Sequence, residues 1–273
     1  YAMSFEQEFT KDNLDIYLKE LAKELRKIDR SGMPVEIILV GGAAILENYG
    51  FRNATKDIDA VFRSLVSVKD AVNRVGDRFN LPNGWLNMDF IRTCSYSPKL
   101  YEISRYYKTF SHILEVRTVS AEYLIAMKMR AGRRYKNDVS DIIGILGEHE
   151  NSGTPITMER IDMAVKTLYG GWDSIDPWLK LYVEQAMTEK NYSEKYQETR
   201  QTEMKSKELL VGFQQDYPDV LNDENANKIA ESLGSASAKR KEKRASVIEK
   251  LRSPASQDNS NTKKRDNGME HDR

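Results

Sequence analysis

The alternation of apolar and polar residues predicts an amphipathic helix at residues 4–29, followed by a buried strand. Apolar side chains recur in the first segment at the spacing of one helix face, at Phe5, Phe9, Leu14, Tyr17, Leu18, Leu21, Leu25 and Ile28. The Ser-Gly-Met-Pro sequence at residues 31–34 ends this helix. Residues 35–40 are almost continuously apolar, which is typical of a central strand that is covered on both faces.

The pattern after this strand predicts a turn, a short helix and a second strand. Gly41 and Gly42 form the turn, and residues 43–49 are expected to form a short apolar helix. A polar loop then leads into residues 57–62 (Asp-Ile-Asp-Ala-Val-Phe), which are predicted to form the second strand.

The remaining pattern predicts one more helix and strand and then a helical half. A helix is expected at residues 67–79, and a strand at residues 112–119, where β-branched residues alternate with polar ones. The segment between them, residues 88–110, predicts only short strands and loops. Further helices are predicted at residues 120–131, 136–148, 157–169, 174–188 and 190–215.

These elements predict an α+β fold in three parts. Residues 1–150 are expected to form a small mixed β-sheet with flanking helices, and residues 151–217 a helical extension. Apolar content collapses from residue 218, so residues 218–273 are expected to be a mostly disordered tail. Hydrophobic residues make up 40% of the 273-residue chain, which is enough for a substantial core.

Charge is unevenly distributed along a chain whose net charge is zero. Residues 235–273 contain 11 Lys and Arg against 6 Asp and Glu, so this tail is net +5 and the rest of the chain is net −5. A basic tail on an acidic body can bind nucleic acid or an acidic partner, or can simply keep the chain soluble.

The chain carries one cysteine, Cys94, which cannot form an intramolecular disulfide, and the sequence shows no secretory signal. The longest near-apolar run, residues 37–46, is far shorter than the ~20 residues that span a bilayer. The sequence therefore predicts a cytoplasmic protein that does not bind membranes.

Two carboxylates at the start of the second strand form the first candidate site. Side chains at positions i and i+2 of a strand share one face, about 7 Å apart along the backbone, so Asp57 and Asp59 can reach one metal ion. Mg²⁺ prefers one or two protein carboxylates together with waters and substrate phosphates. The alternative is a pair of surface carboxylates with no metal.

The glycine turn that ends the first strand is the second candidate site. Without side chains at Gly41 and Gly42, backbone N–H groups can approach a phosphate, and the next helix directs its N-terminus at the same place. An ordinary strand-to-helix turn is the alternative. The order of elements favours nucleotide binding, with Thr55 close to the second strand as a further contact.

A third group of candidates lies about 70 residues further along the chain. Lys128 and Arg133 belong to a cluster of cations at a helix end, which can neutralise polyphosphate or can be a solvated basic face. Asp141 lies one turn after Asp138 on the next helix and can orient Lys128 or an arginine, or act on the attacking group. Glu115, on the strand at residues 112–119, is the candidate third metal ligand.

These motifs resemble the nucleotidyltransferase superfamily, which has the polymerase-β-like fold. The resemblance rests on Gly-Gly-Ala-Ala at residues 41–44 and Thr-Lys-Asp-Ile-Asp at residues 55–59. The helix around Lys128 and the Asp138-Val-Ser-Asp141-Ile sequence are similar to the AbiE-type and MenT-type toxin branch of that superfamily. The Trp85-Leu-Asn sequence is similar to a related family of small bacterial nucleotidyltransferases.

The sequence therefore predicts a Mg²⁺-dependent nucleotidyltransferase, with Mn²⁺ as a substitute and an NTP as substrate. The resemblance implies an RNA acceptor, such as a tRNA end, or a protein acceptor, in a bacterial toxin–antitoxin or phage-defence system with a cognate antitoxin. Two rival hypotheses remain. The first is a catalytically inactive relative that binds a nucleotide or a partner, and the second is an interaction module whose functional part is residues 151–273.

Overall fold

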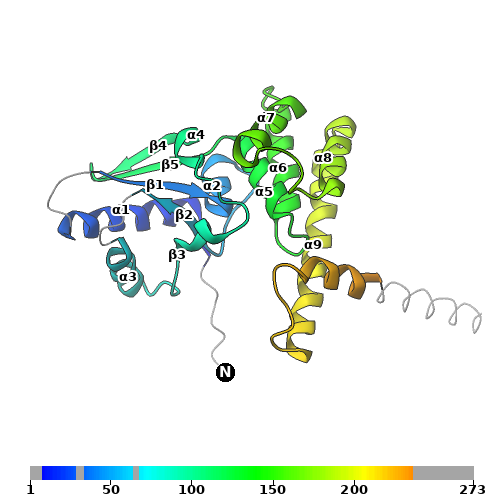
Figure 1. Ribbon diagram of the computed structural model, residues 1–273. Coiled ribbons are helices and arrows are strands. Elements are labelled where there is room, and N and C mark those ends of the chain that lie inside the picture. Colours follow the sequence, from blue (N-terminus) through cyan, green and yellow to red (C-terminus); the bar gives the residue numbers. More distant parts are fainter. Residues whose placement is uncertain (1–7, 29–33, 64–67, 236–273) are drawn as a thin grey trace, which may run out of the picture. The chain divides into compact units, whose positions relative to one another are not determined.

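The computed structural model describes residues 8–28, 34–63 and 68–235 (Figure 1). Its contacts divide the chain into a first unit, Tyr1–Ala230, and a second unit, Glu231–Arg273, of which residues 231–235 are described and helical. The start of the first predicted helix with Phe5, the turn at residues 31–33, and most of the predicted tail lie outside the described residues. All contacts discussed below are within the first unit.

Within the described residues, one mixed sheet has the strand order β3-β2-β1-β5-β4. The central strand is β1 (Val35–Val40), as its apolar sequence predicts. It pairs antiparallel with β2 (Ile58–Phe62) and parallel with β5 (Leu114–Thr118). The outer strands are β3 (Leu86–Asn87), parallel to β2, and β4 (Arg105–Phe110), antiparallel to β5.

Helices α1 (Lys11–Ile28) and α3 (Val68–Phe79) pack against each other beside the sheet (Figure 1). The periodic face of α1 becomes its buried face, with Leu14, Leu18 and Leu21 fully buried. The rings of Tyr17 and Trp85 meet edge to face at 5.9 Å between centroids. The first amphipathic helix therefore packs its apolar face against the sheet and α3.

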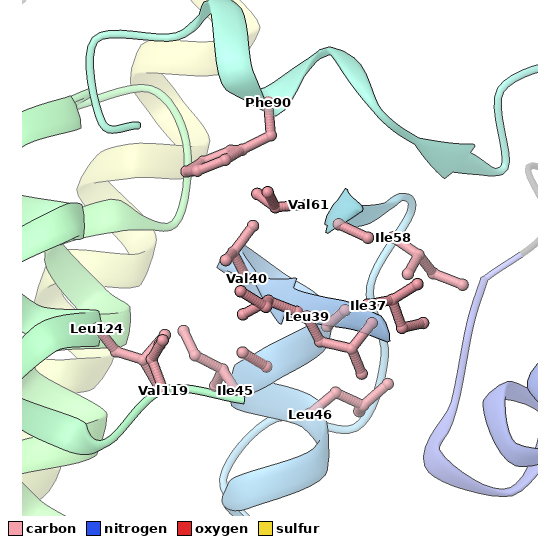
Figure 2. Packing of buried hydrophobic residues seen from close by; sticks show 14 of the residues in the cluster. Ile37, Leu39, Val40, Ile45, Leu46, Ile58, Val61, Phe90, Val119 and Leu124 are labelled. Carbon is pink, nitrogen blue, oxygen red and sulfur yellow. The ribbon is translucent and has the colours of Figure 1, made fainter. Parts of the chain in front are cut away.

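The core around β1 is built from both sides of the strand. Figure 2 shows Leu39 and Val40 of β1 surrounded by Ile45 of the helix α2 (Gly41–Asn48), Val61 of β2 and Phe90. These five side chains are at most 7% exposed. The end of β1 and the start of α2 are therefore set in a rigid apolar surrounding.

The second half of the first unit is helical. It contains α5 (Ala121–Ala131), α6 (Asp138–Asn151), α7 (Met158–Tyr169), α8 (Pro177–Glu189) and α9 (Tyr192–Asp216). Helix α5 packs on α2, α6 and α7, and α6 packs on α8 and α9. Helix α2 thus joins the sheet to the helical half, and the mixed sheet with flanking helices confirms the predicted α+β fold.

Two regions differ from the sequence expectation. The segment at residues 88–110 contains a 3-10 turn (Asp89–Arg92), the short helix α4 (Leu100–Ile103) and the edge strand β4. Residues 226–230, in the predicted disordered tail, are helical, and Ala226 and Ala230 are buried with Leu210 of α9. No helix in the described part of the chain has both the length and the apolar character needed to cross a bilayer.

We predict that Leu21→Ala lowers the free energy of unfolding by about 2–5 kcal/mol, because it leaves a cavity in the core beside the sheet. Ile16→Ala on the same helix is the matched control, since Ile16 is 52% exposed and its truncation should change stability by less than about 1 kcal/mol. Urea unfolding of both variants measures the difference. Equal effects would contradict the docking of α1 on the sheet.

Candidate active site

The Gly41-Gly42 turn lies directly against the side chain of Asp59. Val40, the last residue of β1, is in register with Asp59 on β2. Gly41 has φ +59°, and a Cβ atom there would lie 2.9 Å from Oδ2 of Asp59. A Cβ atom on Gly42 would lie 2.5 Å from Oγ1 of Thr55. Both positions therefore require glycine, because the Asp59 carboxylate and the Thr55 hydroxyl leave no room for a side chain. This requirement holds whether or not a phosphate also binds there.

Helix α2 begins at this turn without a side-chain cap. Its N-cap residue, Val40, has extended backbone angles and makes no capping hydrogen bond. The first N–H groups of a helix have no partner within the helix, and they carry partial positive charge. The start of α2 can therefore bind an anion next to the Asp59 carboxylate.

Asp57 and Asp59 flank the fully buried Ile58, as the strand period predicts. Asp57 is exposed and precedes β2 by one residue, whereas Asp59 is half-buried. Burial, and then the charge of Asp57, raise the pKa of the Asp59 carboxyl. A cation bound beside Asp59 would offset the charge of Asp57 and favour the ionised form of Asp59.

Asn87 of β3 holds one oxygen of Asp59. The two residues are in register, and the Asn87 Nδ2 donates to Oδ1 of Asp59 at 2.8 Å. The Asn87 Oδ1 in turn accepts from the backbone N–H of Asp89 at 2.8 Å. Asn87 therefore fixes the orientation of the Asp59 carboxylate.

Lys128 forms the centre of a buried ion-pair network between α5 and α6. Its Nζ lies 2.9 Å from Oδ1 of Asp138 and 2.9 Å from Oδ2 of Asp141. Burial lowers the pKa of Lys128, but the Asp138 and Asp141 carboxylates outweigh this effect and raise it. Lys128 therefore remains charged while only 8% exposed. Both acids at the start of α6 thus bind the lysine, where the sequence favoured Asp141 alone.

Arg133, in the loop between α5 and α6, is held by Asp138. Its Nε donates to Oδ2 of Asp138 at 2.7 Å, and its Nη2 donates to Oδ1 at 3.2 Å. A guanidinium has five N–H donors, and the bonds to Asp138 use two of those on Arg133, so the same side chain can also bind phosphate oxygens. Burial acts to raise the pKa of the Asp138 carboxyl, but Lys128 and Arg133 lower it well below its usual range.

The cations of this network lie close to the carboxylates of β2. Lys128 and Arg133 both act to lower the pKa of Asp59, against the larger effect of burial. Arg52 links the two groups directly, because its guanidinium lies against Gly42 and binds Asp141, which in turn binds Lys128. The structure therefore connects the glycine turn, with Asp59 against it, to the Lys128 network. These elements are separated by about 70 residues in sequence.

Arg52 is a further member of the network that the sequence pattern did not indicate. Its Nη1 donates to Oδ2 of Asp141 at 2.8 Å, and its Nη2 donates to Oγ1 of Thr55 at 3.4 Å. Thr55 is buried, and its hydroxyl donates to the backbone oxygen of Asp57 at 3.1 Å. Arg52 and Thr55 thus connect the helical half to the backbone that carries Asp57.

Glu203 of α9 fixes the start of α6 and was also missed. It accepts hydrogen bonds from the backbone N–H groups of Val139 at 2.9 Å and Ser140 at 3.2 Å, and from Oγ of Ser140 at 2.5 Å. Burial raises the pKa of Glu203 to about 7, although these hydrogen bonds act in the opposite direction. A cap supplied from a helix more than 60 residues away leaves no local sequence signal.

Glu115 is not brought to this place. On β5 it is in register with Glu36, whereas Asp59 is in register with Val40, four positions or about 13 Å further along β1. Its carboxylate instead accepts from Nη1 of Arg117 at 2.9 Å. The parallel register of β1 and β5 therefore separates Glu115 from the Asp57–Asp59 pair.

The donor set fits a metal that takes most of its ligands from substrate and water. Asp57 and Asp59 would supply hard oxygen atoms, which suit Mg²⁺ or Mn²⁺. In the part of the chain that the structure describes, no group of three or more His, Cys, Asp or Glu side chains could hold a metal. A metal at this place would depend on phosphate oxygens to complete its coordination.

We predict that the stability of the wild-type protein depends on pH through Glu203. Its pKa is raised from 4.5 to about 7 in the folded state, so its contribution is greatest below pH 4.5 and is lost as the pH rises towards 7. At about 1.4 kcal/mol per pKa unit, wild type should lose about 2–3 kcal/mol between pH 5 and pH 8 relative to Glu203→Gln, which keeps a capping oxygen. Chemical unfolding at both pH values tests this. Parallel pH profiles for the two proteins would contradict it.

Comparison with known families gives one match. Residues 17–146 match the model of a family described as a nucleotidyltransferase of unknown function (DUF6036). The match extends from α1 into α6 and therefore includes every candidate site residue from Gly41 to Asp141. Neither the curated proteins nor the solved structures contain a significant match to the chain. The family match supports assignment of residues 17–146 to the nucleotidyltransferase superfamily.

Proposed function

We propose that this protein is a Mg²⁺-dependent nucleotidyltransferase that moves a nucleotide from an NTP to an acceptor hydroxyl and releases pyrophosphate. The observation that carries the proposal is the contact between the Gly41 turn and Asp59, with Arg52 linking Gly42 to Asp141 and so to Lys128. Each of these features suits one part of a metal-nucleotide complex. The carboxylate pair suits the metal, and the uncapped helix start and the cations suit the phosphates.

The candidate residues divide into two groups by their exposure and bonding. Asp57 and Asp59 hold the metal, while the backbone at Gly41 and Gly42 and the free N–H groups of Arg133 bind the triphosphate. Lys128 and Asp141 are buried and bound to each other, so their role is to position the arginines that face the substrate. Thr55 acts in the same way on Asp57, because its hydroxyl binds the Asp57 backbone.

The proposed reaction is an in-line displacement at the α-phosphorus. The acceptor oxygen forms a bond to this phosphorus and loses its proton, while the bond from phosphorus to the bridging oxygen breaks and pyrophosphate leaves with that oxygen. Bound Mg²⁺ would lower the pKa of the acceptor hydroxyl and neutralise developing charge. The protein groups fix the two reactants relative to each other, which is the main contribution that proteins make to this class of reaction.

The acceptor class rests on the resemblance to toxin nucleotidyltransferases. On that basis we propose an RNA or protein acceptor in a toxin–antitoxin or phage-defence system with a cognate antitoxin. Incubation with each labelled NTP, Mg²⁺ or Mn²⁺, and total RNA or cell extract identifies the acceptor by the macromolecule that becomes labelled. Absence of label with all four NTPs would favour the inactive, binding-only alternative.

We predict that Asp59→Asn or Asp57→Asn lowers the rate of labelling by about 100-fold or more. Loss of a residue that only supports a metal ligand typically lowers metal affinity or activity by about 10- to 100-fold, and loss of the ligand itself should lower it further. Asp70→Asn, which removes an exposed carboxylate from α3, is the matched control and should retain full activity. Wild-type activity in the Asp59 variant would reject the assignment of the metal site.

We predict that Arg133→Lys raises the KM for NTP about 10- to 100-fold while kcat changes less. The lysine keeps the positive charge but loses the planar fork that can bind Asp138 and phosphate oxygens together. Steady-state kinetics with varied NTP measures the effect. An unchanged KM would show that Arg133 does not contact the nucleotide.

A further inference from the structure

The side chain of Asn227 bonds to the backbone on both sides of Arg133. Its Nδ2 donates to the carbonyl oxygen of Gly132 at 2.9 Å, and its Oδ1 accepts from the N–H of Arg134 at 3.0 Å. Asn227 lies more than 90 residues after this loop in sequence, within the same unit of the fold.

Other contacts of the loop include a hydrogen bond from the Lys136 N–H to the carbonyl oxygen of Arg133 at 3.4 Å and one from Arg134 Nη2 to Asp176 at 2.8 Å. Gly132 ends α5, and residues 133–137 belong to neither helix. The backbone N–H of Arg133 is bound from one side by Oδ2 of Asp138 at 3.2 Å. The amide of Asn227 binds the neighbouring peptide groups, so the backbone of Arg133 is held through three consecutive residues.

The segment that carries Asn227 is itself anchored. Asn222 accepts through Oδ1 from the N–H groups of Glu224 and Asn225, at 3.1 and 3.0 Å, which starts the helical turn. The hydroxyl of Tyr135 donates to Asp223 at 3.2 Å. A small apolar cluster joins the segment to α9 and to Tyr135; Leu210, Ala226 and Ala230 are buried in it, and Leu221 and Ile229 are partly buried. Asn227 therefore projects from a fixed base.

We propose that residues 222–230 form a clamp on the loop between α5 and α6, in which Asn227 is a positioning residue that sets the affinity for the nucleotide through Arg133. This inference rests on the proposed function, because it assigns Arg133 to the triphosphate. The clamp fixes the peptide groups on either side of Arg133, whereas Asp138 holds the guanidinium and the N–H of Arg133 itself. Loss of the clamp therefore leaves the ion pair intact and allows the loop to move away from the glycine turn.

The test compares Asn227→Ala with Asn13→Ala in the full chain. Asn13, at the start of α1, also makes two side-chain bonds to backbone: it accepts from the N–H of Thr10 at 2.8 Å and donates to the carbonyl oxygen of Glu8 at 3.1 Å, outside both the clamp and the loop. We expect Asn227→Ala to raise the KM for NTP roughly tenfold with kcat within about twofold, as the loss of two modest hydrogen bonds implies. Asn13→Ala should leave both constants within about twofold of wild type.

A second measurement needs no nucleotide. Trypsin cleaves after arginine, so the rate of cleavage at Arg133 and Arg134 in the folded protein reports the opening of the loop. This rate should rise several-fold in Asn227→Ala and remain near wild type in Asn13→Ala. Tyr135→Phe removes only the bond to Asp223 and should shift the KM and the cleavage rate less, but in the same direction.

The outcomes separate the two proposals. If wild type neither binds nor transfers any NTP, the proposed function fails, and the cleavage rates alone decide whether the clamp exists. If wild type uses NTP but Asn227→Ala matches Asn13→Ala in KM and in cleavage, the clamp is overturned and the proposed function stands.

Discussion

The buried pairing of Lys128 with Asp138 and Asp141 is the constraint on which the rest of the site depends. A charge that is removed from water must be paired, and removal of one partner of such a pair typically costs about 3–5 kcal/mol. The network here is shared among several elements, since Arg133 binds Asp138 and Arg52 binds Asp141. The network therefore fixes the last turn of α5, the first turn of α6 and the loop before β2 relative to one another.

This network links the sheet to the helical half of the fold, because Arg52 in the loop before β2 binds Asp141 of α6. The sheet half provides the turn at Gly41 and the carboxylate of Asp59, and the helical half provides the cations. Glu203 of α9 holds the first turn of α6, so a helix outside the family match determines where Asp138 and Asp141 lie. The residues after 146 thus support the site as well as extending the chain.

The local motifs were predictable from sequence, and the long-range contacts were not. The strand period correctly placed Ile58 in the core between Asp57 and Asp59, and the apolar run correctly placed β1 at the centre of the sheet, because these properties depend on neighbouring residues. Glu115 was predicted as a metal ligand only because it lies on a strand. The register of β5 with β1 shows that it lies opposite Glu36, near the start of β1, whereas Asp59 lies opposite Val40 at the end of β1. Arg52 and Glu203 act through partners more than 60 residues away, so no local pattern reveals them.

The central claim is that the turn at Gly41, the pair Asp57 and Asp59, and Arg133 bind one metal-nucleotide complex. A crystal structure with Mn²⁺ and a non-hydrolysable NTP analogue tests it most directly, because manganese is located by its anomalous scattering. We expect manganese between Asp57 and Asp59, with the triphosphate against the first turn of α2 and in contact with Arg133. A nucleotide bound elsewhere, or manganese away from both aspartates, would contradict the account.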